Sequence, residues 1–575
     1  MIGDRKFDRL ARAYPDTNQG RTLRAGYLRD RVLGSARTGL LLLMGAAAVF
    51  LLIGCANVAN LLLARALARR REMAIRAALG AGRMRIVRQF VTESGVLAVF
   101  GGLGGYALAA LAWTLLPAVT PMSIPRLAET RVDWTVFVFA LAVSVLTGVL
   151  SGIAPAWRMA MQAPAVALRE SGARGTAGPS RNRLRAALLI SEIAVTVVLV
   201  VIGGTLTGSF VRLLRTDPGF AAGRILASII VPSGDRYKDH PEDRALLYRH
   251  ILDVVRTLPA VESAGAVDAL PFSGENTGGW VTATDAGAAR PGTQSIAEVD
   301  RVSAGYLETM GVRLLEGRWF REEDVDPLRD VAIVNDLAAA HFWPAGNAVG
   351  SRLCLNCAPG RPSDWKRVIG VVGSIRHAAL DQPPGLEVYL SGGSLASAAF
   401  LVVRTNQPSA GLIREIRRAV AGVDPNQPVF LSARMSTLIA DSLADRRFIL
   451  TLLAITGCLA LLFSAAGVYG VVSYVTSRRT SEIGVRMALG AAPRQVHALV
   501  FGQGMGMTAF GIAIGLPAAL ALTRVLRHVL AGAQAADPAL IGIAVGLVAC
   551  AAAMACWIPA RRATRIDPVA ALRQE

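Results

Sequence analysis

The amino-acid sequence predicts an α-helical polytopic membrane protein with about seven transmembrane helices and one extracytoplasmic domain of mixed α/β structure. Hydrophobic residues make up 53% of the 575 residues and charged residues only 18%. The apolar residues gather in uncharged blocks too long for the core of a soluble protein. Arginine is concentrated in the connections on one side of these blocks, and one polar region, 213–446, interrupts them.

Seven uncharged blocks are each long enough to cross a membrane. A helix rises about 1.5 Å per residue, and the hydrocarbon core is about 30 Å thick. Each block holds 19 to 30 residues, which fits transmembrane helices better than the buried helices of a large soluble protein. In chain order the blocks are Thr38–Ala64, Gly95–Pro117, Trp134–Trp157, Ile193–Val211, Phe448–Ser477, Ala498–Thr523 and Pro538–Ala560.

The net charge of +20 is distributed in a way that orients the chain. The connection 65–88 carries eight Arg against one acid, and 158–185 carries six Arg against one acid. The connection 118–133 is neutral, with two Arg and two acids. Positively charged loops remain in the cytoplasm, so the Arg-rich connections and the C-terminus are expected there and the N-terminus outside. This distribution explains the basic charge, and no nucleic-acid partner is expected.

An eleven-residue phrase occurs twice, each time between two apolar blocks: REMAIRAALGA at 71–81 and SEIGVRMALGA at 481–491. The identical positions are Glu72, Arg76, Ala78, Leu79, Gly80 and Ala81, matched by Glu482, Arg486, Ala488, Leu489, Gly490 and Ala491. The repetition indicates that blocks one to three and blocks five to seven are two copies of one three-helix unit.

Each copy of the phrase predicts a short amphipathic helix close to a membrane exit. Good helix formers come first, and the run then meets glycines that stop a helix. Glu482 and Arg486 stand four residues apart, as do Glu72 and Arg76, so each pair can bridge on one helical face. The predicted apolar side contains Met73, Ala77 and Leu79 in the first copy and Ile483, Met487 and Leu489 in the second. Two interpretations stay open: an interfacial helix that anchors the topology, or a docking element for a two-fold symmetric partner.

The polar region predicts one mixed α/β domain. Strand-like runs occur at 225–231, 331–334, 368–372 and 400–404, and helical runs occur at 242–258 and 409–421. Strands that alternate with amphipathic helices favour a small βαβ-type fold.

Few residues in the chain suggest chemistry. Cys354 and Cys357 form one C-x-x-C, for which a disulfide and two free thiols both stay open. Zinc is disfavoured there because no second pair of ligands follows. The sequence contains neither G-x-x-x-x-G-K-[ST] nor H-E-x-x-H, so we predict no catalytic residue, no metal site and no bound cofactor.

Two further sets of residues concern the membrane blocks. Glu93 and Glu192 border spans, and we interpret both as interfacial caps rather than as a proton path. The small-xxx-small pairs Gly101/Gly105 and Gly511/Gly515 predict close helix packing. The uncharged runs of 27 and 30 residues ahead of the two phrases exceed the hydrocarbon core, so those helices are expected to continue outward as stalks.

The segments CANVANLLLARALARRREMAIRAALGAGRMRIVRQFVTES (55–94) and GVYGVVSYVTSRRTSEIGVRMALGAAPRQVHALVFGQG (467–504) resemble the MacB/FtsX-type permeases of ABC transporters. More narrowly, they look like the duplicated permeases, in which two such units are fused in one chain. SEIAVTVVLVVIGGTLTGSFVRLLRTDPGF (191–220) is similar to the first span of such a unit running into its extracytoplasmic domain. The resemblance covers residues 38–575.

The resemblance implies units of one span, an extracytoplasmic domain and three further spans, with a cytoplasmic coupling helix between the second and third spans. It implies coupling helices at 71–82 and 481–493. The implied ATPase-coupling residues are Glu72, Arg76, Leu79, Gly80, Glu482, Arg486, Leu489 and Gly490.

The first unit of this chain departs from that pattern, because no span or large domain precedes block one. Residues 1–37 carry nine Lys or Arg against four Asp, and we expect them to be the tail of an incomplete first extracytoplasmic domain. The other expected parts are a first three-helix membrane unit at 38–160, a cytoplasmic linker at 161–185, a transmembrane helix at 186–212, the extracytoplasmic MacB-like α/β domain at 213–446, a second three-helix membrane unit at 447–562 and a cytoplasmic tail at 563–575.

The resemblance further implies a permease subunit in the bacterial inner (cytoplasmic) membrane. ATP would be hydrolysed by a separate ABC ATPase dimer on the cytoplasmic side, so this chain itself would bind no cofactor. The implied outcome is export of a hydrophobic or amphipathic compound, a peptide or a lipoprotein, with a periplasmic adaptor or an outer-membrane component as a further partner. Two alternatives stay open: a mechanotransmitting regulator of an envelope enzyme, and a membrane scaffold or sensor without an ATPase.

Overall fold

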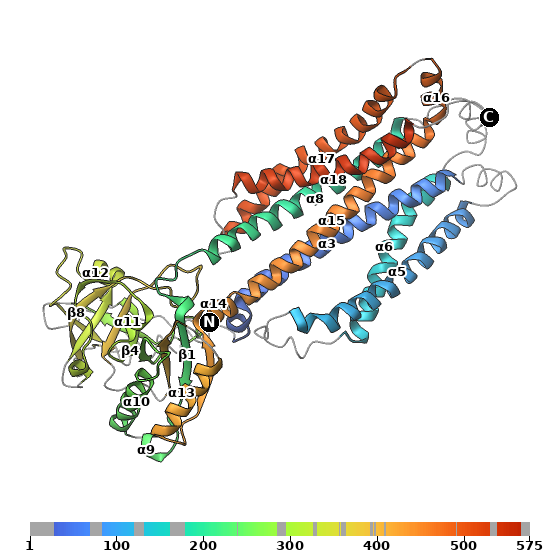
Figure 1. Cartoon of the computed structure of the whole chain (residues 1–575). Helices are drawn as coiled ribbons and strands as arrows, with labels where there is room; N and C mark the ends of the chain where they lie inside the picture. Colours follow the sequence, from blue (N-terminus) through green and yellow to red (C-terminus); the bar gives the residue numbers. More distant parts are fainter. Residues whose placement is uncertain are drawn as a thin grey trace, which may run out of the picture. The chain divides into compact units, whose positions relative to one another are not determined.

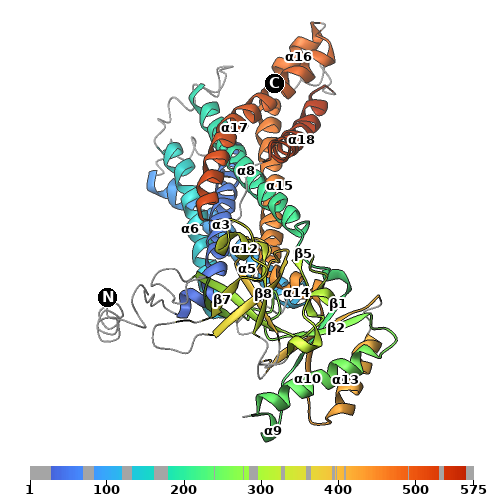
Figure 2. The ribbon, with the colours of Figure 1, turned by 90° about the vertical axis from the view of Figure 1, so that its left-hand side faces the viewer.

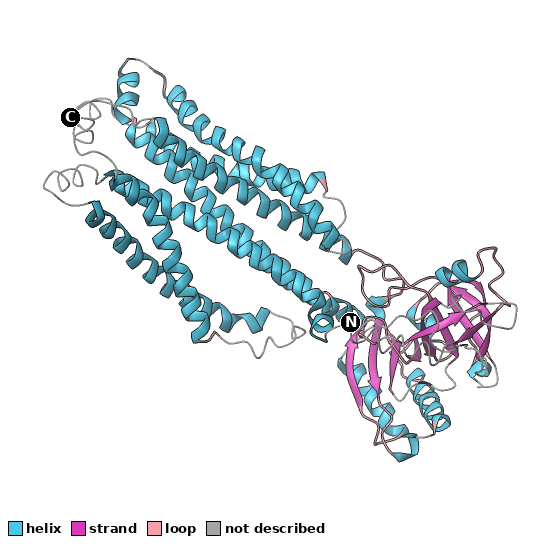
Figure 3. Ribbon diagram, turned by 180° about the vertical axis from the view of Figure 1, so that it is seen from behind, coloured by secondary structure: helices cyan, strands magenta, loops and turns pink. Residues whose placement is uncertain are grey.

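The computed structural model describes residues 28–68, 83–119, 132–160, 179–238, 240–275, 277–283, 295–325, 330–355, 357, 364–391, 395, 398–406, 410–489, 491–529 and 537–564. The chain divides into two compact units (Figure 1). The polar unit contains Arg212–Leu443, and the helical unit contains the described residues of 33–211 and 444–575. Strands occur in the polar unit, whereas the described part of the helical unit is built of helices (Figure 3).

The helical unit confirms the predicted membrane class. Its helices are α3 (Leu28–Ala68), α5 (Arg83–Val119), α6 (Trp134–Ala160), α8 (Pro179–Leu214), α15 (Ala444–Arg478), α16 (Thr480–Ala488), α17 (Pro493–Val529) and α18 (Pro538–Ala563). Among the described residues, six helices are long and apolar enough to cross a membrane: α3, α5, α8, α15, α17 and α18. The remaining predicted block lies in α6, whose apolar segment Trp134–Leu150 is shorter.

One apolar cluster holds α8 against α15, α17 and α18. The α8 side of the cluster is a row of buried residues spaced four apart, which lie on one face of the helix: Leu189, Ile193, Val197 and Val201. Val468 and Val472 contribute from α15, and Val548 and Ala552 contribute from α18. The single span α8 is therefore packed together with the three helices that follow the polar unit in sequence.

The pair Gly511/Gly515 on α17 makes the close packing that the sequence predicts. A Cβ at Gly511 would lie 2.6 Å from Ile193 Cγ2, and a Cβ at Gly515 would lie 2.5 Å from the carbonyl oxygen of Ala194. Because the atom that Gly515 meets belongs to the backbone, no side-chain rotation could make room there. This prediction is confirmed.

The corresponding pair on α5 does not behave in the same way. No described atom lies within 4 Å of a Cβ built at Gly101 or Gly105, so the predicted packing is wrong for this pair. The close approach of α5 and α6 uses other glycines: a Cβ at Gly148 would lie 3.1 Å from Ser94 O, and one at Gly102 would lie 3.1 Å from Ser144 Cβ. The glycines of α5 and α17 are therefore equivalent in sequence but not in packing.

The polar unit is mixed α/β, as predicted. Its elements are η2 (Ala222–Arg224), β1 (Ile225–Ile230), α9 (Asp235–Lys238), α10 (Pro241–Arg256), β2 (Ser263–Val267), β3 (Gly278–Thr282), β4 (Ser295–Val302), α11 (Tyr306–Met310), β5 (Leu314–Gly317), η3 (Glu322–Val325), β6 (Val331–Asn335), α12 (Asp336–Phe342), β7 (Arg352–Leu355), β8 (Asp364–Val372), β9 (Glu387–Ser391), β10 (Ala399–Arg404), α13 (Ala410–Val423), β11 (Val429–Arg434) and α14 (Met435–Ser442). All four predicted strands and both predicted helices are present, within a few residues of the predicted ends.

Four strands in the order β11-β1-β10-β2 form one part of the sheet. All three pairings are antiparallel, so β1 and β2 run in the same direction with β10 between them, as do β10 and β11 with β1 between them. The connections β1-α10-β2 and β10-α13-β11 are thus two interleaved split βαβ units. α10 and α13 lie side by side on this sheet (Figure 2) and share its core through Ile251, Val255 and Ile416.

Six of the other strands close into a ring, and β5 pairs with β8 outside it. The pairings run β4–β3, β3–β7, β7–β8, β8–β6, β6–β9 and β9–β4, so the sixth pairing returns to the first strand. The pairings β4–β9 and β6–β8 are parallel. A second apolar core, with Val281, Val334 and Val388 among its buried members, fills this part. The simple βαβ-type prediction did not anticipate the ring.

We expect Gly515→Leu to destabilise the helical unit because its Cβ would collide with the backbone of α8. Overpacking of this kind costs about 1–3 kcal/mol or more of unfolding free energy. The measurement is the thermal midpoint for loss of the monodisperse gel-filtration peak in detergent. Gly502→Leu on the same helix is the matched control, since no described atom lies within 4 Å of its Cβ position. Equal midpoints for the two variants would contradict the packing assignment.

Candidate functional site

The second copy of the repeated phrase forms α16, at the tip where α15 and α17 meet (Figure 1). The helix begins at Thr480 and ends at Ala488, and Pro493 begins α17. Proline suits the first turn of a helix because the N–H that it lacks would have no partner there. The predicted segment 481–493 is thus a nine-residue helix followed by a short turn.

Backbone hydrogen bonds determine how this segment folds. The N–H of Ile483 donates to the carbonyl of Arg479 at 2.8 Å and joins α16 to the end of α15. At the other end, the N–H of Leu489 donates to Val485 O at 3.0 Å and the N–H of Ala491 donates to Arg486 O at 2.9 Å. These bonds satisfy carbonyls that the end of a helix would otherwise leave exposed.

One side of α16 packs against the other helices of the helical unit. Ile483 is 3% exposed, and Met487 packs against the same apolar cluster. Ile483 also lines a small, mostly apolar cavity together with Val472 and Arg479 of the α15 end and Val500 of α17. A displacement of α16 would therefore press directly on α15 and α17.

The opposite side of α16 is exposed. Leu489 is 83% exposed and Val485 is 43% exposed, and the side chain of Arg486 is also exposed. We call Val485, Arg486 and Leu489 the α16 surface. Exposed apolar side chains beside polar ones mark surfaces that contact another protein or the membrane.

The structure corrects the predicted orientation of Leu489, which was grouped with Ile483 and Met487 on the apolar inner side. Successive helical residues are about 100° apart, so a position two residues after Met487 points away from it. Leu489 also follows the last helical residue, Ala488.

The structure gives no side-chain geometry for the remaining predicted coupling residues. Glu72, Arg76, Leu79, Gly80 and Gly490 lie outside the described residues. Glu482 lies in α16, and its side chain is not among those described. That both copies of the repeated phrase dock on a two-fold symmetric partner therefore stays a prediction.

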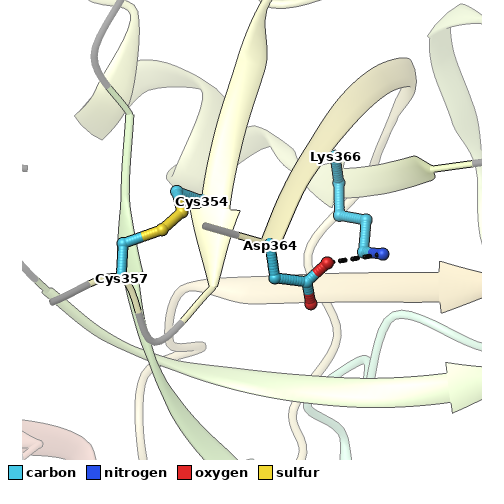
Figure 4. The surroundings of a disulfide bond; sticks show 4 residues. All are labelled: Cys354, Cys357, Asp364 and Lys366. Atoms are coloured by element: carbon cyan, nitrogen blue, oxygen red, sulfur yellow. Dashed lines mark ion pairs between the residues drawn. A yellow bond between two sulfur atoms is a disulfide. The ribbon is translucent and has the colours of Figure 1, made fainter. Parts of the chain in front are cut away.

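The two cysteines of the C-x-x-C lie in the polar unit and are joined by a disulfide, with Cα atoms 5.8 Å apart (Figure 4). Cys354 belongs to β7, and Cys357 follows the end of that strand. Lys366 on the neighbouring strand β8 pairs with Asp364 at 2.7 Å (Figure 4). Disulfides persist in oxidising compartments, which agrees with the extracytoplasmic position predicted for this domain.

A second polar site lies inside the helical unit. The carboxyl group of Glu192 on α8 is only 2% exposed, and Asn57 Nδ2 of α3 donates to Glu192 Oε1 at 2.7 Å. The same amide nitrogen donates to the backbone carbonyl of Phe463 on α15 at 3.1 Å. One amide thus connects three helices, and the prediction that Glu192 is an interfacial cap is wrong.

Gly467 on α15 provides the space for this cluster. A Cβ at Gly467 would lie 2.7 Å from Glu192 Oε2 and 2.8 Å from Asn57 Oδ1. Glu192 Oε2 has no hydrogen-bond partner among the described residues. Sequence reasoning missed Asn57 and Gly467, and the available signal was an amide at position 57 inside an otherwise apolar block.

Two family models match the chain. The FtsX-like permease C-terminal family matches 44–164 and again 454–568, which are the two copies of the three-helix unit. The MacB-like periplasmic core domain matches 186–419.

Curated relatives are similar over part of their length. A macrolide export ATP-binding/permease protein MacB from Chromobacterium violaceum is 26% identical over 361 residues, which cover 59% of this chain and 51% of the relative. MacB of Escherichia coli K12 is 23% identical over 48% of this chain and 44% of the relative. An uncharacterized ABC transporter permease from Methanocaldococcus jannaschii is 35% identical over 22% of this chain and 32% of the relative. The chain thus spans about half of the length of the MacB proteins that it matches.

Two solved structures are also similar. The periplasmic region of MacB from Actinobacillus actinomycetemcomitans matches with a TM-score of 0.27 and 15% identity, covering 40% of this chain and 95% of that chain. The extracellular domain of the ABC-type transporter YknZ from Gram-positive bacteria matches with a TM-score of 0.24 and 13% identity, covering 36% of this chain and 100% of that chain.

The bond between Asn57 and Glu192 predicts energetic coupling between the two residues. Asn57→Leu should lower the stability of the wild type more than that of Glu192→Leu, because the buried carboxyl group loses its hydrogen-bond donor only in the first case. The expected coupling is about 1 kcal/mol, within the range found for hydrogen bonds between membrane helices. The measurement is a double-mutant cycle of unfolding in detergent, and strictly additive effects would contradict the bond.

Proposed function

Because the chain belongs to the MacB/FtsX-type permeases of ABC transporters, we propose that it is the permease subunit that receives mechanical work from a separate ATPase. The observation that carries the proposal is the division of α16 into two sides. Ile483 and Met487 attach the helix to α15 and α17, whereas Val485 and Leu489 on the opposite side are exposed. The exposed Leu489 lies beside the exposed Arg486, and an apolar side chain next to a charge suits a contact with a protein partner.

The ATPase in this proposal is a dimer that binds on the cytoplasmic side and contacts both copies of the repeated phrase. The basic residues around α16 support this side of the membrane by the positive-inside rule, because Arg478, Arg479 and Arg494 flank it. The C-terminus would then be cytoplasmic and the N-terminus outside, in the inner membrane of a bacterium. ATP would be bound by the partner and not by this chain.

The motion would pass along α15 and α8. α15 has 35 residues and α8 has 36, so each would measure roughly 50 Å against a hydrocarbon core of about 30 Å. Each helix therefore has several turns beyond the apolar core. The chain enters the polar unit from α8 and leaves it into α15, so both helices would move that domain when the ATPase closes.

We propose export of a hydrophobic or amphipathic compound, a peptide or a lipoprotein. The relatives from Chromobacterium violaceum and Escherichia coli are named macrolide export proteins, and this supports an amphipathic cargo. A periplasmic adaptor or an outer-membrane component would be the further partner of the polar unit.

Leu489→Glu and Arg486→Glu should each abolish copurification of the ATPase. The first change places a charge in an apolar contact, and the second reverses a charge at its edge. The measurement is a detergent pull-down of the tagged chain from its own cells with a non-hydrolysable ATP analogue, followed by mass spectrometry and an ATPase assay of the eluate.

The matched control is Arg418→Glu, an equal change of charge on the exposed side of α13 in the polar unit. It should leave ATPase recovery unchanged. Recovery of an ATPase with all the variants would show that it docks elsewhere. Absence of an ATPase from the wild-type eluate would favour a scaffold or sensor.

A further inference from the structure

A cluster of acidic residues and one histidine lies where the ring of strands meets the segment between β8 and β9. Glu298 and Asp300 are alternate residues of β4 and therefore point to the same side of the sheet. Their partners in the parallel pairing with β9 are Glu387 and Tyr389. His377 comes from the segment that connects β8 to β9. The sequence predicts no metal site, because these residues do not form a recognisable motif.

Three of these side chains present donor atoms to one point. One donor atom from each of Glu298, Asp300 and His377 lies within 4.8 Å of the other two. The ring nitrogen Nδ1 of His377 is 3.7 Å from Asp300 Oδ2, and Nε2 is 3.9 Å from Glu298 Oε1. Donor atoms around a tetrahedral zinc ion lie roughly 3.3 Å apart, for ligand distances of about 2.0–2.2 Å. Because one ion binds only one ring nitrogen, the side chains would have to rotate so that this nitrogen and both carboxylates reach that spacing.

The imidazole of His377 is buried. Its side chain is 9% exposed, and neither ring nitrogen makes a well-aligned hydrogen bond among the described residues, although the backbone of Glu275 faces the ring. Both nitrogens face carboxylates at distances too long for a hydrogen bond. A buried polar group in this situation costs free energy unless a further partner is present. The imidazole therefore points to a ligand between it and the carboxylates.

The charges around the cluster are mostly negative. Asp268 is paired with Arg301 at 3.6 Å, and within the described residues no ion pair brings Lys or Arg to Glu298, Asp300 or Glu387. Glu387 Oε1 has no hydrogen-bond partner among the described residues. A divalent cation would offset this excess of buried carboxylates.

Hydrogen bonds from residues outside the proposed ligand set orient the donor atoms. The hydroxyl group of Thr277 donates to Asp300 Oδ1, which leaves Oδ2 directed toward His377. The N–H of Thr277 donates to Glu298 Oε1 at 2.7 Å, and the N–H of Phe272 donates to the backbone carbonyl of His377 at 2.8 Å. Ligands of metal ions are commonly held by such outer contacts.

We propose that Glu298, Asp300 and His377 bind one divalent transition-metal ion in the polar unit, with Zn²⁺ as the best match. An imidazole with two carboxylates suits zinc, whereas Mg²⁺ and Ca²⁺ prefer oxygen ligands alone. Three protein ligands leave a fourth position for water. No residue of this site belongs to the α16 surface, so zinc binding can be tested without an ATPase.

The ion would stabilise the segment between β8 and β9, which contacts the residues that follow α8. The N–H of Arg376, next to His377, donates to Pro218 O at 2.9 Å, four residues after the end of α8. A Cβ at Gly219 would lie 2.6 Å from the carbonyl oxygen of Ser374, so the two segments are closely packed. Metal binding would thus fix His377 to β4 beside the point where α8 ends.

The test uses the full chain in detergent, with its affinity tag removed and its metal stripped with a chelator. After equilibrium dialysis against Zn²⁺, elemental mass spectrometry should find one zinc per chain. Asp300→Asn and His377→Gln should each weaken zinc binding more than about tenfold. A hundredfold excess of zinc over its Kd should raise the unfolding midpoint of the polar unit by about 5 °C or more, and Asp300→Asn should remove this shift.

The control is His240→Gln. His240 also faces a carboxylate, Glu242 at 3.2 Å, but both side chains are mostly exposed. This variant should bind zinc like the wild type. If His377→Gln does not fold, Asp300→Asn, which has nearly the same shape as the original residue, still decides. Absence of stoichiometric zinc from the wild type, zinc binding unchanged in Asp300→Asn, or displacement of zinc by equimolar Ca²⁺ would each overturn the proposal.

Discussion

The interior of a bilayer offers no water to satisfy a polar group, and the helical unit depends on this constraint. Continuous helices satisfy the backbone within each span. A side chain such as Glu192 needs a partner from another helix, and Asn57 supplies it. Because Asn57 lies in the first repeat and Phe463, its second acceptor, lies in the second repeat, one amide connects the two copies. Gly467 is required at this place because any larger residue would fill the space that the two polar groups occupy.

The polar unit is joined to the spans at two neighbouring strands. β1 is the first strand after α8, β11 is the last strand before α14 and α15, and the two strands pair directly with Ile230 opposite Val429. A relative shift of α8 and α15 would therefore act first on one strand pair at the edge of the sheet. β1 belongs to one split βαβ unit and β11 to the other. The two units share the apolar core that contains Ile251 and Ile416. The domain can thus move as a body when its two ends move.

Local sequence patterns predicted much of this fold. The parts that they did not predict depend on contacts between residues far apart in the sequence. Uncharged length predicted the spans, and strand and helix periodicity predicted β1, β6, β8, β10, α10 and α13. The closure of β4 on β9 joins residues such as Val299 and Val388, and nothing in either strand specifies that partner. Glu192 was misjudged for the same reason, since its amide partner lies 135 residues earlier. For the candidate site, sequence located α16 but misplaced Leu489, because membership of an apolar set does not fix the angle around a helix.

The two ends of α8 explain why one short surface and one buried cluster can belong to the same mechanism. Within the helical unit, α8 shares its core with α15 and α17, and those are the helices on which α16 rests through Ile483. At its other end, the turn after α8 is hydrogen-bonded to the segment that carries His377, through Pro218 and Arg376. Displacement at α16 would therefore reach this turn through close packing in α8, without a channel through the bilayer. A metal ion at His377 would stiffen the first contact that this displacement meets, so its occupancy would set how much of the motion the ring of strands receives.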